Sequence, residues 1–76
     1  MAKYTAENII NAFTDLDEMM QHGNGPIMLL SPQQMFEMGQ FYEWAKPIVN
    51  NNDIDMNSEH DVPDDIEWVI GETQGW

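Results

Sequence analysis

Hydrophobic side chains recur at three- and four-residue spacing over residues 6–21, with polar residues on the opposite side. The apolar stripe consists of Ile9, Phe13, Leu16 and Met20. This spacing is typical of an amphipathic helix. Thr5 is placed to act as the N-cap, and His22 followed by Gly23 is a typical helix end. The pattern therefore predicts a helix from about residue 6 to residue 21.

A second stretch with helical spacing covers residues 32–46. Ser31, Pro32 and Gln34 carry the signature of a capping box, with proline at its favoured first position. The apolar positions that follow are Met35, Met38, Tyr42 and Ala45, with Phe36, Phe41 and Trp44 beside them. Pro47 disfavours helical geometry at the residue before it, so this helix is predicted to end or kink at Lys46.

The segments around these two helices are less regular. Residues 23–26 predict a turn, and residues 27–30 predict a short connector or strand. Residues 50–62 are polar and acidic and predict a surface loop. Pro63 and the acids after it are typical of a helix start, with Asp61 as a possible cap and Gly71 as the end. The apolar residues Ile66, Trp68 and Ile70 stand at every second position, and this spacing would equally suit a strand.

These elements predict a single, mainly α domain over residues 1–76. It would contain two amphipathic helices and a short C-terminal helix or strand. A chain of this length supports one small hydrophobic core. The predicted core consists of Ile9, Phe13, Leu16, Met20, Met35, Met38, Tyr42, Ile66 and Val69.

Composition narrows the possible environments. The chain has no cysteine, which excludes disulfides and thiolate metal sites and favours a reducing cytosol. Its first residues lack the apolar segment of a secretory signal, and no apolar run approaches the roughly 20 residues that span a bilayer. The sequence predicts a cytoplasmic protein without a membrane segment.

The net charge is the strongest indication of what the protein binds. Fourteen acids face two bases, Lys3 and Lys46, and the formal net charge is −12. Such a surface repels nucleic acid and attracts basic proteins. Eight of the acids lie from Asp53 onward, and no base follows Lys46. We therefore expect the partner-binding residues in the C-terminal part, namely Asp53, Asp55, Glu59, Asp61, Asp64, Asp65, Glu67 and Trp68. Trp68 is included as an aromatic anchor, as Trp76 could also be, although Trp68 would equally suit the core.

Catalytic and metal chemistry find little support in the sequence. His22 and His60 are the only histidines, and neither belongs to a recognisable nucleophilic arrangement, so no catalytic residue and no cofactor are predicted. Oxygen side chains at alternate positions from Asp53 to Asp64 resemble a calcium loop. Ser58, His60 and Pro63 break that pattern. We expect a solvated acidic loop, with a calcium-binding module as a rival.

The small size, absence of cysteine, compact apolar core, spaced acids and sparse bases resemble phage-encoded DNA-mimic inhibitors. That group includes anti-restriction proteins, anti-CRISPR proteins and inhibitors of uracil-DNA glycosylase. The resemblance is one of overall character and includes no motif match. It implies a basic nucleic-acid-binding protein as partner, whose groove accommodates one negative charge per about 1.7 Å of duplex axis. The alternative is a small regulatory or immunity-type protein that binds a basic partner without imitating DNA.

Overall fold

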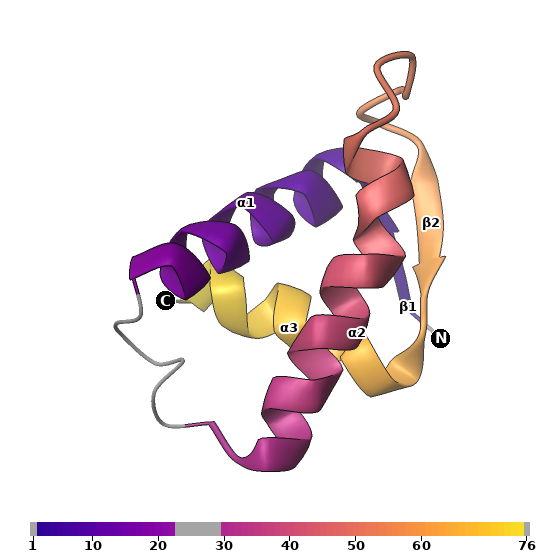
Figure 1. Ribbon diagram of the computed structural model, residues 1–76. Coiled ribbons are helices and arrows are strands. Elements are labelled where there is room, and N and C mark those ends of the chain that lie inside the picture. Colours follow the sequence, from indigo (N-terminus) through magenta and orange to yellow (C-terminus); the bar gives the residue numbers. More distant parts are fainter. Residues whose placement is uncertain (1, 23–29, 76) are drawn as a thin grey trace.

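The mainly α fold is confirmed by the computed structural model, which describes residues 2–22 and 30–75. Its elements in chain order are strand β1 (Ala2–Thr5), helix α1 (Ala6–His22), helix α2 (Pro32–Val49), strand β2 (Glu59–Val62) and helix α3 (Asp64–Gly75) (Figure 1). The C-terminal segment is a helix and not a strand, and it continues past the predicted end at Gly71. The predicted turn at 23–26, the first three residues of the connector 27–30 and Trp76 lie outside the described residues.

The two strands form an antiparallel ribbon that the sequence pattern did not predict. Ala2 lies opposite Val62, and Thr5 lies opposite Glu59. The predicted loop over 50–62 therefore ends at residue 58, and Asp61 lies in β2 instead of capping α3. Val62 is the only fully buried residue of β2. One buried position in a polar segment gives too little alternation to identify a strand from sequence.

The start of α1 is held by three hydrogen bonds. The Thr5 hydroxyl oxygen accepts from the Asn8 N–H at 3.2 Å, which confirms the predicted cap. The N–H groups of Ala6 and Glu7 donate to the carbonyls of Ser58 and Met56, at 2.8 and 3.1 Å. Helix N-termini leave their first N–H groups without partners inside the helix. Here the end of the 50–58 loop supplies two of the acceptors, so loop and helix fix each other.

Helix α2 begins as predicted and ends later than predicted. Its capping box is formed, because the Ser31 and Gln34 side chains each accept from the other residue's N–H, at 3.2 and 2.9 Å respectively. The predicted end at Lys46 is wrong, since the helix passes through Pro47 to Val49. Ile48 and Val49 pack against the core. Their burial offsets the backbone hydrogen bond that proline cannot make.

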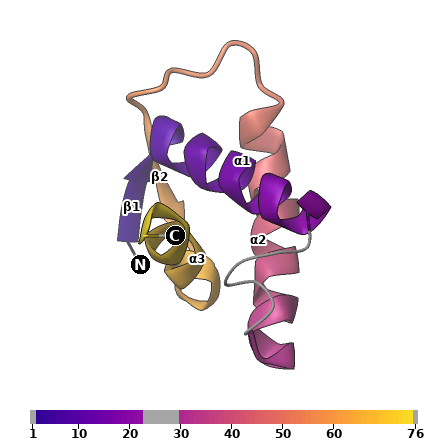
Figure 2. The ribbon, with the colours of Figure 1, turned by 90° about the vertical axis from the view of Figure 1, so that its left-hand side faces the viewer.

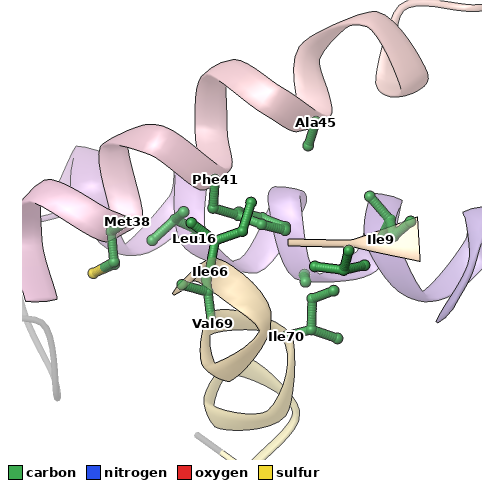
Figure 3. Close-up of a cluster of buried hydrophobic side chains, with 10 residues drawn as sticks. Ile9, Leu16, Met38, Phe41, Ala45, Ile66, Val69 and Ile70 are labelled. Atoms are coloured by element: carbon green, nitrogen blue, oxygen red, sulfur yellow. The ribbon is translucent and has the colours of Figure 1, made fainter. Parts of the chain in front are cut away.

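The three helices enclose one core, with Phe41 between them (Figure 3). Figure 2 shows the ribbon on one side of this body and α2 on the other, with loop 50–58 arching above α1. Residues of all three helices and β2 contribute to the cluster. They are Ile9, Ala12, Leu16, Met38, Phe41, Ala45, Val62, Ile66, Val69 and Ile70.

Five of the nine predicted core residues are buried: Ile9, Leu16, Met38, Ile66 and Val69. Phe13 and Tyr42 are half-buried and pack against the cluster, as does Leu30 from the predicted connector. The prediction is wrong for Met20 and Met35, which are 43% and 55% exposed. Each continues the helical period, but each lies in the terminal turn of its helix, beyond the core cluster.

Candidate functional site

Exposed acidic residues occur on three successive segments along one side of the molecule. Loop 50–58, strand β2 and the first turn of α3 follow one another down the right-hand side of Figure 1. Six of the seven predicted partner-binding acids are exposed there. We call this set the acidic edge, and its members are Asp53, Asp55, Glu59, Asp61, Asp64 and Asp65.

The loop part of the acidic edge has a defined conformation. The Ser58 N–H donates to the Asp55 carbonyl at 3.0 Å, which closes a four-residue turn. The side-chain oxygens of Asp55 and Asn51 accept from the N–H groups of Asn57 and Asp53, at 2.9 and 3.1 Å. Such Asx turns replace missing secondary structure with local hydrogen bonds. Together with the bonds to α1, they hold Asp53 and Asp55 in place.

The strand part of the edge is a row of charges at alternate positions. Glu59 and Asp61 are exposed, whereas Val62 is buried. Alternate strand residues are about 6.8 Å apart, twice the roughly 3.4 Å between charges along one DNA strand. Lys3 lies opposite Asp61 in the ribbon. The other base, Lys46, forms a surface ion pair with a glutamate of its own helix, so only one of the chain's two bases adjoins this row.

Glu67 and Trp68 lie differently from the six exposed acids. Both are half-buried, and Trp68 packs against the core. The indole N–H of Trp68 donates to the Glu37 carboxylate at 2.9 Å and so joins α3 to α2. The structure thus gives Trp68 the core position that its sequence equally suited. Its role as an anchor for a partner stays a prediction.

Two carboxylates with a structural role were missed by the sequence reasoning. Besides Glu37, Asp17 accepts a hydrogen bond from the Tyr42 hydroxyl at 3.3 Å, beside the stacked rings of Phe13 and Tyr42. Both acids occupy polar helix positions that look solvent-exposed in the sequence. The signal that could have found them is the aromatic partner, because a buried tyrosine or tryptophan needs an acceptor for its polar group.

The contact between Ser58 and His60 does not resemble an activated nucleophile. The two side chains lie 3.0 Å apart, from the serine Oγ to the histidine Nε2. The Ser58 hydroxyl donates to the Asp55 carbonyl, and it has only one proton to donate. His60 therefore donates to Ser58, whereas a general base would have to accept from it.

Cation ligands do not gather within residues 2–22 and 30–75, where no group of three or more His, Asp or Glu residues is placed to hold a metal ion. The acids of the calcium-like pattern are spread over a loop, a strand and a helix start. One oxygen of Asp55 already accepts a backbone hydrogen bond. A calcium loop instead wraps its oxygens around a single ion.

No protein-family model, curated protein or solved structure matches this chain. Within the part of the chain that the structure describes, no helix is both long and apolar enough to cross a bilayer. Function is therefore inferred from the charge and geometry of the acidic edge.

Proposed function

We propose that this protein is a cytoplasmic inhibitor that binds a basic nucleic-acid-binding protein through its acidic edge and excludes DNA from that protein's groove. One observation carries the proposal: six exposed carboxylates lie on three successive segments, in a part of the chain that contains no base. This is the kind of surface that phage-encoded DNA mimics present.

Electrostatics supports binding to a basic partner. A net charge of −12 gives the chain a field that attracts positively charged proteins and speeds their encounter. Complementary charge across an interface also excludes acidic partners. Nucleic acid itself would be repelled by this surface, so we expect the protein to bind a DNA-binding protein and not DNA.

The ordered backbone of loop 50–58 and β2 favours specific binding over non-specific electrostatic attraction. Ordering a mobile segment lowers affinity, so a surface that is already ordered binds more tightly. Loop 50–58 is held by its own turns and by the start of α1, and β2 is held by β1. The backbone that carries the acids of loop 50–58 and β2 is therefore held in place before any partner arrives.

Asp64 and Asp65 have a second role that the test must separate. Acids in the first turn of a helix interact favourably with its dipole. Both residues lie in the first turn of α3, so they stabilise that helix whatever they bind. A test of the proposal must therefore not rest on these two residues alone.

The decisive experiment compares two variants that each lose three exposed acids. The edge variant is Asp53→Asn/Glu59→Gln/Asp65→Asn, with one change in each segment of the edge. The control variant is Asp15→Asn/Glu18→Gln/Glu72→Gln, with all three changes away from the edge. Asp17 is left intact because it accepts the hydrogen bond from Tyr42.

The natural partner is first captured from a lysate of the source cell with the tagged protein and identified by mass spectrometry. Affinity for the purified partner is then measured by calorimetry, with and without a competing DNA duplex. We expect the edge variant to bind about tenfold more weakly or worse, with a much smaller loss in the control. Equal losses would reject the acidic edge as the binding site. Unimpaired DNA binding by the complex would reject mimicry and favour the regulatory or immunity-type alternative.

A further inference from the structure

The outer face of α2 carries an exposed apolar patch that the proposed function does not use. Met35 and Phe36 are each 55% exposed. Together with Gly39, Gln40 and Glu43 they line a shallow depression of about 600 Å³. We call this depression the α2 hollow.

Gly39 lies in the middle of α2, where the packing of the fold does not require a glycine. A Cβ atom built at this position meets nothing within 4 Å among the described residues. Glycine inside a helix lowers helix stability relative to alanine. A bare backbone, however, lets another group approach the helix closely. The α2 hollow therefore provides room for a side chain from outside the molecule.

Charge indicates what kind of molecule can approach this face. Glu43 and Lys46 are the only charged residues among the exposed positions of α2, and they pair at 3.7 Å. The face is thus close to neutral on a chain of net charge −12. A basic partner gains little attraction here. A second copy, which the rest of the surface repels, meets the least repulsion at this face.

We propose that two copies of this chain associate through antiparallel α2 helices, with Phe36 of each copy packed into the α2 hollow of the other. Phe36 and Gly39 lie on one face of α2, about one helical turn apart, and a two-fold axis requires such a self-complementary face. With Phe36 over Gly39 in both directions, the two Glu43 residues lie roughly 16 Å apart along the helix axis. At physiological salt that separation is beyond the screening length of about 8 Å.

The size of the patch sets the strength of this association. Five residues line the α2 hollow, whereas stable interfaces use about 20–30 residues on each side. The dimer is therefore weak and forms at high protein concentration. It is independent of the proposed function, and its salt dependence is opposite. Salt screens the repulsion between two acidic copies and favours the dimer, whereas it weakens binding to a basic partner.

Sedimentation velocity tests the proposal, from micromolar to millimolar protein and at low and high salt. We expect the wild type to form a reversible dimer that tightens with salt. Phe36→Gln and Gly39→Leu should each weaken the dimer about tenfold or more, as loss of a central contact does. The matched control is Met56→Gln, which removes a residue that is 47% exposed on loop 50–58 and should leave the dimer unchanged.

Circular dichroism checks that the variants are folded. Gly39→Leu should be at least as heat-stable as the wild type, because leucine favours the helix more than glycine does and a Cβ atom at this position meets nothing within 4 Å. A wild type that stays monomeric at millimolar concentration in high salt would overturn the proposal. A dimer that survives both α2 substitutions would also overturn it, since the contact would then lie elsewhere.

Discussion

The helical body and the acidic edge use the same chemical group in different ways. In the body, the carboxylates of Asp17 and Glu37 accept hydrogen bonds from Tyr42 and Trp68, and these bonds join α1 to α2 and α2 to α3. On the edge, six acidic residues are exposed on three successive segments. An acid stabilises this fold where an aromatic donor reaches it or where it lies in the first turn of α3, whereas the exposed acids of loop 50–58 and β2 should lower stability by repulsion.

Net charge alone therefore does not predict how an acid affects the stability of this protein. Two residues of the same type, such as Glu37 and Glu59, have opposite expected effects on the free energy of unfolding. Removing body acids should weaken the fold, whereas removing the edge acids of loop 50–58 and β2 should spare it. Three experiments test this contrast between the body and the acidic edge.

The largest effect is expected in the core that the body encloses. Phe41→Ala should lower the free energy of unfolding by about 3–5 kcal/mol, because it leaves a cavity among buried side chains. Small domains have little more than that in total, so much of the protein should be unfolded. Urea unfolding followed by circular dichroism measures the loss. Phe36→Ala is the matched control in the same helix and, being exposed, should change stability by less than about 1 kcal/mol.

A smaller effect is expected at the joint between α2 and α3. Glu37→Ala should cost about 1–2 kcal/mol, since it leaves the Trp68 indole N–H without its acceptor. A double-mutant cycle with Trp68→Phe should give a coupling energy of about 1 kcal/mol. Glu43→Ala is the control, because exposed ion pairs like that with Lys46 contribute roughly 0–1 kcal/mol. A coupling near zero would mean that the hydrogen bond does not hold the two helices together.

The smallest effect is expected on the edge, with the opposite sign. Asp53→Asn/Glu59→Gln should raise the free energy of unfolding at low salt, by up to about 0.5 kcal/mol, as mutual repulsion falls. The comparison variant Asp17→Ala/Glu37→Ala loses the same number of charges together with the two acceptors, and should lower that free energy instead. Thermal unfolding at low and high salt compares them. A loss of stability in the edge variant would show that the edge contributes to the fold.

The helices could be predicted from the sequence because their signals are local. Thr5 and Ser31 cap their helices through residues three positions away. The apolar period then identifies the buried face. The period alone could not show where that face stops being covered, so Met20 and Met35 were wrongly placed in the core.

The ribbon and the helix joints could not be predicted because they depend on distant residues. β1 pairs with a strand near the other end of the chain, each strand has only four residues, and β2 has no apolar alternation of its own. Trp68 finds its acceptor in another helix. For the candidate site, six of the seven acids chosen from the sequence are exposed, whereas Glu67 is half-buried. It could not predict that loop 50–58 would be held against α1, since backbone carbonyls leave no trace in a sequence.

The bonds between loop 50–58 and the start of α1 also impose an order on folding. During synthesis, β1 and the first turn of α1 leave the ribosome long before their partners in β2 and the loop. The contact between α1 and α2 joins nearer segments and can form sooner, because shorter loops close at lower entropic cost. Closure of the ribbon comes late and gives the acidic loop its conformation. Because eight of the fourteen acids lie from Asp53 onward, the chain also acquires most of its negative charge in this last stage of synthesis.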